Sequence, residues 1–200
     1  MKNAIDEIQR IKLKLFIEDS RGSNSPQPRD FIPIFHEWIQ KSAVNGVLID
    51  IANYDHLPDG PGVMLITHEG NYCIERRNGC LGLQYSRKYP IEAPLPQRLM
   101  AIWRILLKAA QLLKEEPQLS GRIEFRGDEI QIIANDRLLA PNTEVSLTNL
   151  QPVLTEFLNK LYGPSHYQIF RDADPRELLT LTVKSLQPVP FQTLLDRTCA

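Results

Sequence analysis

The residues most able to do chemistry gather in one stretch, from Asp50 to Gly70. It reads DIANYDHLPDGPGVMLITHEG and holds two of the four histidines, with carboxylates around each. Imidazole and carboxylate groups together are typical ligands of a hydrolytic zinc or a mononuclear iron, and they also serve as general acids and bases. Hydrolysis, with or without a metal, is therefore the first chemistry to consider.

The apolar run Val63–Thr67 separates the two histidines. If it is one extended strand, His56 and His68 leave from opposite ends, roughly 15 to 20 Å apart at ~3.3 Å per residue. The HExxH spacing is absent, because Glu69 is followed by Gly-Asn-Tyr, and a reverse turn accounts for those residues. We therefore predict no metal site.

The loop Tyr54 to Gly62 is the better candidate for a site. It is longer than a hairpin needs, so it brings hydroxyl, imidazole and carboxylate groups together without using them in the turn. Its DGPG motif at 59–62 lacks the lysine and helix of a phosphate loop, and a tight turn with positive φ at a glycine is the preferred interpretation. The candidate catalytic residues are Asp50, Tyr54, His56 and Asp59, with Asn53 and Asp55 beside them.

Composition excludes several classes of protein. Lysine and arginine number 23 against 24 acidic residues, whereas a domain that neutralises phosphates is normally basic. Charges interrupt the N-terminal region where a signal peptide needs an apolar core, and no apolar run approaches the ~20 residues of a membrane helix. Three scattered cysteines suit a reducing compartment. We expect a cytoplasmic protein that binds neither nucleic acid nor membrane.

Alternation of apolar and polar residues predicts most of the strands. In KLKLFIE, at 12–18, it turns Leu13, Leu15 and Ile17 inward. The β-branched run GVLIDIAN, from residue 46, predicts a central strand, and VMLIT predicts a shorter one. GRIEFRGDEIQIIAN predicts a hairpin that turns at Gly127-Asp128, and HYQIF with LLTLTVK predicts a last hairpin.

The strongest hairpin signal is Asn78-Gly79, between two alternating runs. This register pairs Ile74 with Leu83. It puts Cys73 and Cys80 on the same, outer side of the hairpin, about 13 Å apart at ~3.3 Å per residue. We therefore predict neither a disulfide nor a shared metal site between them. The predicted core face consists of Tyr72, Ile74, Leu81, Leu83 and Tyr85.

Three amphipathic helices are predicted, near 30–43, 95–116 and 148–162. Asp30 is the expected N-cap of the first. The second carries a broad apolar stripe through Leu106, and the third is expected to be capped by Thr148 or Asn149. The tail, 189–200, is predicted to dock as a short turn of helix.

Four runs are distinctive: FIPIFHEWIQ, LIDIANYDHLPDGPGVMLITHEGNY, LQYSRK and NDRLLAPNTE. Through them the chain resembles, along most of its length, a set of uncharacterised proteins from cyanobacteria and other bacteria. The resemblance implies a bacterial, cytoplasmic setting and a housekeeping or regulatory role. It implies no established activity, fold or ligand, so it assigns no role to any residue.

Together these patterns predict an α+β fold of about eight mostly antiparallel strands with three main helices. The length suits one domain, 1–200; two lobes, about 1–117 and 118–200, that share a core are the alternative.

The predicted function is that of a non-catalytic binding or accessory protein. Its partner would be another protein, a second copy of the chain or a small ligand. The alternative is a small enzyme, hydrolytic or metal-dependent, with its site around the loop Tyr54 to Gly62. A pocket where the candidate residues converge would favour the enzyme, and an apolar patch or free sheet edges would favour the binding protein. The sequence identifies no cofactor.

Overall fold

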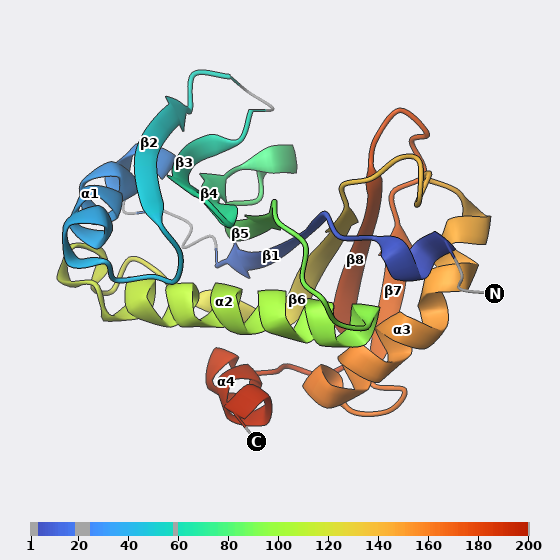
Figure 1. The fold of residues 1–200 in the computed structure, drawn as a ribbon. Coiled ribbons are helices and arrows are strands. Elements are labelled where there is room, and N and C mark those ends of the chain that lie inside the picture. Colours follow the sequence, from blue (N-terminus) through green and yellow to red (C-terminus); the bar gives the residue numbers. More distant parts are fainter. Residues whose placement is uncertain (1–3, 19–24, 58–59, 200) are drawn as a thin grey trace.

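The computed structural model describes residues 4–18, 25–57 and 60–199 (Figure 1). Within these ranges one antiparallel sheet contains all the strands, in the order β2-β3-β4-β5-β1-β6-β8-β7. Their bounds are β1 Ile11–Ile17, β2 Leu48–Tyr54, β3 Gly62–Thr67, β4 Gly70–Glu75, β5 Gly82–Arg87, β6 Phe125–Ala134, β7 Tyr167–Arg171 and β8 Leu179–Ser185. The predicted α+β class and the number of strands are confirmed.

In the described part of the chain, four α-helices and four short 3-10 helices accompany the sheet. The α-helices are α1 Ile32–Lys41, α2 Leu95–Glu115, α3 Glu144–Tyr162 and α4 Phe191–Cys199. The 3-10 helices are η1 Ala4–Glu7, η2 Pro28–Phe31, η3 Arg77–Gly79 and η4 Pro117–Leu119. The helix beyond the three predicted main ones is α4, in the tail where the sequence predicts a turn of helix. No helix among the described residues is long and apolar enough to cross a membrane.

The central strands of the sheet come from both halves of the chain. Strand β1 pairs with β5 on one side and with β6 on the other, and Leu13 lies opposite Ile132. Segments 1–117 and 118–200 therefore share one sheet, and their buried apolar side chains form one core cluster.

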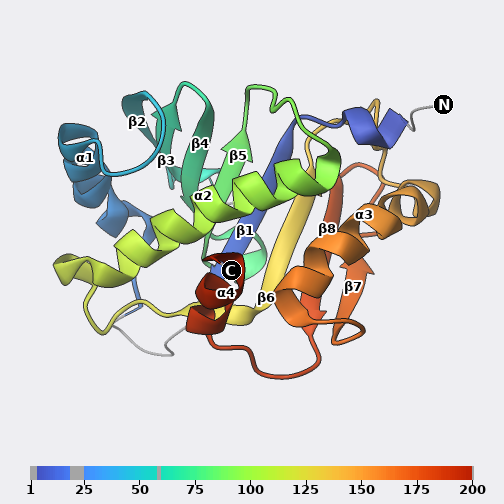
Figure 2. The same cartoon turned by 60° about the horizontal axis from the view of Figure 1, so that its bottom comes forward.

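The four α-helices cover the same face of this sheet, and α2 runs across its middle (Figure 2). The side chains that alternate inward from β1, such as Leu13 and Leu15, are buried beneath it. On α2 itself Trp103 and Leu106 are fully buried, and the Trp103 indole N–H donates to the Thr198 hydroxyl (3.0 Å) on α4. The predicted apolar stripe thus faces the sheet and the C-terminal helix.

The hairpin of β4 and β5 has the predicted register. Ile74 pairs with Leu83, and Tyr72 with Tyr85. The turn is a single 3-10 turn in which Asn78 takes the left-handed conformation with φ of 55°. Cys73 is a buried free thiol and Cys80 an exposed one.

Two of the strand predictions are wrong. The run at 48–54 is the edge strand β2, with Ile49 57% exposed, because β-branched residues suit a pleated surface without determining its place in the sheet. Residues 125–134 form one strand instead of a hairpin. Ile17 pairs with Phe125 and Leu15 with Ile130, so residues 126–129 bulge from β6 opposite Phe16.

The glycine of this bulge is needed for packing. A Cβ atom on Gly127 would lie 2.1 Å from the Val189 carbonyl oxygen, so the segment before α4 can cross the bulge only over a glycine. The Gly-Asp pair therefore marks a bulge beneath a crossing segment, not a reversal of the chain.

Helix starts also differ from the sequence prediction. Thr143 caps α3 by accepting the Ser146 N–H (3.2 Å), so Thr148 and Asn149 lie inside the helix. Asp30 lies in η2, where its carboxylate accepts the Gln27 N–H (3.1 Å) and pairs with Arg122 (2.6 Å). At α3 a hydroxyl group a few residues earlier supplies the cap, and at α1 the preceding 3-10 helix leaves Phe31 instead of Asp30 at the N-cap.

We expect Leu106→Ala to lower the free energy of unfolding by about 2 to 5 kcal/mol, because it leaves a cavity at a fully buried position. Urea denaturation measures this. Arg104→Ala, at an exposed position of the same helix, is the control and should change stability by no more than about 0.5 kcal/mol. A loss below about 1 kcal/mol for Leu106→Ala would contradict the assignment of α2 to the core.

Candidate functional site

The described residues that the sequence singled out lie at exposed positions on β2 and in the turn after it. Asp50 is exposed on β2, and its carboxylate accepts the N–H of Ile51 (2.7 Å). Tyr54 ends β2 at 39% exposure, and His56 is exposed in the turn that follows the strand. Asp59 lies outside the described residues.

His68 and Glu69 are engaged in contacts at the opposite end of β3. The His68 imidazole stacks on Tyr89, with ring centroids 4.4 Å apart. The Glu69 carboxylate accepts the N–H of its own backbone and that of Val47 (3.1 Å), and these hydrogen bonds hold its pKa below the usual range. Within the described ranges no three histidine, cysteine or acidic side chains gather as a metal site would require.

The sheet has a second face, opposite the helices, which we call the open face. Successive strand residues alternate between faces, so Lys12 and Lys14 point to the open face while Leu13 points to the core. One cross-strand row on this face is polar along five strands. It consists of Cys73, Gln84, Lys14, Gln131 and Thr182.

A buried ion pair lies in the middle of the open face. The Lys14 ammonium is 2.6 Å from the Glu75 carboxylate, and the two side chains are only 2% and 7% exposed. Lys14 also donates to the Cys80 carbonyl (2.8 Å), and Glu75 accepts the N–H of Arg77 (2.6 Å). Both charges therefore have several partners, which a buried pair needs to offset its desolvation.

Gly82 makes room for this pair. A Cβ atom there would lie 2.4 Å from Cε of Lys14 and 2.6 Å from the Leu15 carbonyl oxygen. The lysine side chain can therefore pass over β5 to reach β4 only because residue 82 has no side chain.

Next to the ion pair, the open face is hollowed, with a volume of about 210 Å³. This suits a small metabolite and is below the usual range for drug-sized ligands. Its lining comes from the strands β1, β4, β5 and β6, from η3, and from the segments just before β3 and β8. The lining residues are Lys12, Gln84, Gln131 and Ile133 below, Glu75 and Arg77 at one side, and Gly60, Pro61 and Leu178 at the rim. They do not include Asp50, Tyr54 or His56.

Lys12 is the distinctive group of this hollow. Its side chain is half-buried, and burial lowers the pKa of its ammonium below the usual value, with the positive Arg77 as a smaller cause in the same direction. Among the described residues it makes no hydrogen bond or ion pair. Burial raises the pKa of Cys73 to about 12, so the neighbouring thiol is uncharged near neutral pH. The Glu75 carboxylate, which is paired with Lys14, is the nearby negative charge that opposes the lowering of the Lys12 pKa.

Two loops meet over the open face. The turn η3 leaves β4 at the Phe16 end of β1, and the segment 172–178, which we call the strap, leaves β7 at the Ile11 end. These ends are about 17 Å apart at ~3.3 Å per residue. The Arg77 guanidinium nevertheless pairs with the Glu177 carboxylate (2.6 Å), so this ion pair spans the face along the central strands.

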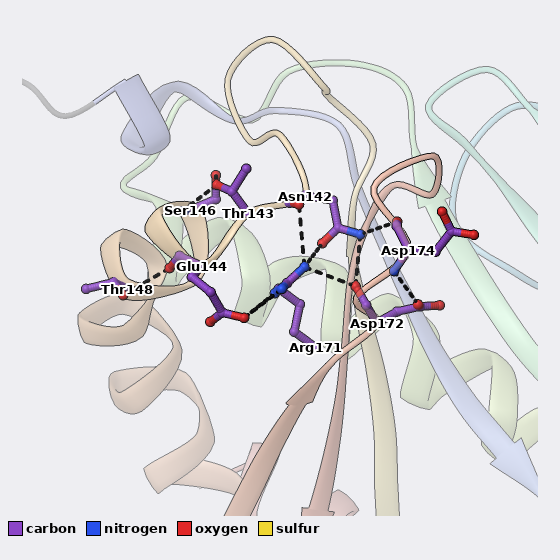
Figure 3. Close-up of polar contacts among 8 residues, drawn as sticks. All are labelled: Asn142, Thr143, Glu144, Ser146, Thr148, Arg171, Asp172 and Asp174. Atoms are coloured by element: carbon purple, nitrogen blue, oxygen red, sulfur yellow. Dashed lines mark hydrogen bonds and ion pairs between the residues drawn. The ribbon is translucent and has the colours of Figure 1, made fainter.

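The base of the strap is held by a network around Arg171 (Figure 3). Arg171 donates to the Glu144 carboxylate (2.6 Å) and to Asn142 (2.9 Å). The Asn142 amide in turn donates to the carbonyl groups of Asp172 and Asp174 (2.9 and 2.8 Å). The strap is therefore fixed to the start of α3 independently of its contact with Arg77.

A different hollow lies inside the core, between the sheet, α2 and α3. It is lined by apolar side chains, Ile132 and Leu154 among them, and its volume is about 20 Å³. That is close to the space of one water molecule, so this gap is a packing defect and not a ligand site.

Sequence reasoning placed Lys12 and Lys14 outward but did not identify them as site residues. The alternation in KLKLF was the available signal. It could not show that the outer face of a central strand is itself covered, because the covering groups come from residues near 60, 77 and 178.

Comparison of the chain with protein-family models, with curated proteins and with solved structures finds no match. The function of this protein must therefore be inferred from the chemistry of the hollow.

Apolar side chains are exposed along one segment at the β2 edge of the sheet, with Val47 at 63% and Ile49 at 57%. Edge strands offer backbone groups to other chains, and charged side chains are a common protection against such pairing. On β2 the charged group is the carboxylate of Asp50, which accepts the Ile51 N–H and so occupies one backbone donor of the edge strand.

We expect Lys14→Met to lower the free energy of unfolding by about 3 to 5 kcal/mol, because it leaves the Glu75 carboxylate buried without its cation. The double variant Lys14→Met with Glu75→Gln removes both charges and should recover part of that loss. Urea denaturation of the three proteins tests this. If Lys14→Met is as stable as wild type, the ion pair of Lys14 with Glu75 is in contact with solvent and the prediction is wrong.

We expect Asp50→Ala to increase self-association, because it exposes the Ile51 N–H on an edge strand with apolar neighbours. Sedimentation velocity over a concentration series measures the effect. Asp55→Ala removes the same charge from the same exposed segment and is the control. Equal association of the two variants would assign the effect to charge alone.

Proposed function

We propose that this protein is a non-catalytic binding protein that holds a small anionic molecule in the hollow of the open face. The observation that carries the proposal is Lys12, a half-buried cation that lines the hollow and has no ion pair among the described residues. A buried charge without a partner is costly, and a bound anion would supply the partner.

The other charges around the hollow are already matched. Lys14 is paired with Glu75, and Arg77 with Glu177. Among the described side chains that line the hollow, this leaves one net positive charge, that of Lys12. Carboxylate and phosphate groups are the ligand chemistry that such a charge recognises, through short charge-assisted hydrogen bonds.

The remaining lining gives the ligand a polar side and an apolar side. The amides of Gln84 and Gln131 offer donors next to Lys12, and Gln131 already donates to Thr182 (3.3 Å). Ile133 and Leu178 offer apolar contacts. A short organic acid or a small phosphate ester matches this lining in size and chemistry.

Binding is preferred to catalysis because of what the loop 54–62 contributes. Its described residues at the hollow are Gly60 and Pro61, which bring no titratable side chain. The alternative function, a hydrolytic or metal-dependent enzyme, would need Tyr54 or His56 to reach the ligand, and neither lines the hollow. A protein partner or a second copy of the chain has its support at the β2 edge, in the exposed Val47 and Ile49.

We expect inorganic phosphate and acetate to bind wild-type protein at low ionic strength and to shift the backbone amide resonances of Lys12, Gln84 and Gln131. In Lys12→Met the affinity should fall about tenfold or more, as expected for the loss of a charge-assisted hydrogen bond. Lys88→Met removes one exposed positive charge outside the hollow and is the control. Equal affinities of the two variants would refute the site.

We also expect the bound anion to raise the pKa of Lys12, because a neighbouring negative charge favours the ammonium form that burial disfavours. The side-chain ¹³Cε resonance of Lys12, followed over pH with and without phosphate, measures this. A pKa that stays unchanged at saturating phosphate would place the anion elsewhere.

A further inference from the structure

We propose that the preferred ligand of the hollow carries two anionic groups, and that the Glu177 carboxylate occupies the position of the second group in the unliganded protein. This inference rests on the proposed function, which places the first group at Lys12. It adds a specificity-determining residue, Arg77, and an internal competitor, Glu177.

Arg77 has the geometry required of a second anion-binding group. It lines the same hollow as Lys12, and the two cations are close enough for Arg77 to disfavour the charge on Lys12. The guanidinium is planar and can bind a carboxylate or phosphate through two parallel hydrogen bonds. A ligand with an acid at each end would therefore join Lys12 to Arg77.

Glu177 is the group that such a ligand would displace. Its carboxylate lies 2.6 Å from the Arg77 guanidinium, and the two side chains are 38% and 43% exposed. Exposed pairs of this kind add little to stability, so one carboxylate can replace another at Arg77 at small cost. Glu177 is also directly followed by Leu178, which lines the hollow, so the competitor lies at the rim of the site.

The exchange needs no movement of the strap. Asn142 holds the carbonyl groups of Asp172 and Asp174, and the Arg137 guanidinium donates to the Arg176 carbonyl (2.5 Å). These contacts do not involve Glu177. Rotation of one exposed side chain is therefore sufficient to release Arg77.

The test compares ligands with one and with two acid groups. Affinities of malonate, succinate and glutarate are measured by calorimetry, each against the monocarboxylate of the same carbon number, propionate, butyrate or valerate. The readout is the ratio of dicarboxylate to monocarboxylate affinity for the length that binds best. In wild type this ratio should be higher than in Arg77→Gln, which keeps Lys12 but lacks the second cation.

Glu177→Gln should raise the ratio about two- to fivefold, the range that loss of an exposed ion pair implies. Arg77→Gln should lower the ratio to near one while binding of the monocarboxylate at Lys12 persists. Glu156→Gln, which removes a solvent-exposed, ion-paired carboxylate on α3 outside the hollow, is the control and should leave the ratio unchanged. Melting temperatures of all variants confirm that they are folded.

The two levels of the proposal fail in different ways. If Lys12→Met binds the monocarboxylates as well as wild type does, the proposed function is wrong. If Lys12→Met loses them but Glu177→Gln changes the ratio no more than Glu156→Gln, the inference about Glu177 is wrong and the anion site stands. A ratio unaffected by Arg77→Gln would also overturn it.

Discussion

The ion pair of Lys14 with Glu75 is the contact around which the open face is organised. It joins β1 to β4 across the intervening β5, which is possible only because Gly82 has no side chain. The same lysine holds the Cys80 carbonyl, and the same glutamate holds the N–H of Arg77. The pair thereby fixes both ends of η3, and η3 in turn carries Arg77 to the hollow. Two charges buried at the centre of a sheet thus position groups that lie at its surface.

This arrangement results from a sheet whose four described α-helices all cover the face opposite the open face (Figure 2). The strands β5, β1 and β6 lie in the middle of the sheet, and loops fold over their open face and limit its contact with solvent. The side chains that these strands turn to the open face nevertheless include lysine and glutamine. Polar groups in such a place require partners. Lys14, Glu75 and Gln131 find them within the chain, and Lys12 finds none among the described residues. This half-buried cation, without an ion pair among the described residues, is the basis on which we propose the open face as a binding surface.

The strap shows how a loop can be both fixed and available. Its base is held to the start of α3 by Arg171 and Asn142, through a network of hydrogen bonds that are partly shielded from solvent (Figure 3). Near β8 it is joined to η3 by the exposed pair of Glu177 and Arg77. The partly buried hydrogen bonds of Arg171 and Asn142 therefore hold the backbone of the strap in place. The exposed ion pair of Glu177 is the weaker contact, and it is the one with which the proposed ligand would compete.

The sequence by itself determined the class of fold, most of the elements and the pairing within the β4–β5 hairpin. These depend on local periodicity and turn chemistry, so Asn78-Gly79 and the stripe through Leu106 could be interpreted without knowing the rest of the chain. The place of β2 at the sheet edge and the bulge at Gly127 were decided only by the tertiary structure, because both depend on which segments lie alongside. The same holds for the hollow. Its lining comes from segments near 12, 60, 76, 84, 132 and 178, and only folding brings them together. Burial and pairing, which single out Lys12 among the residues that line the hollow, are properties of that assembly and not of any stretch of sequence.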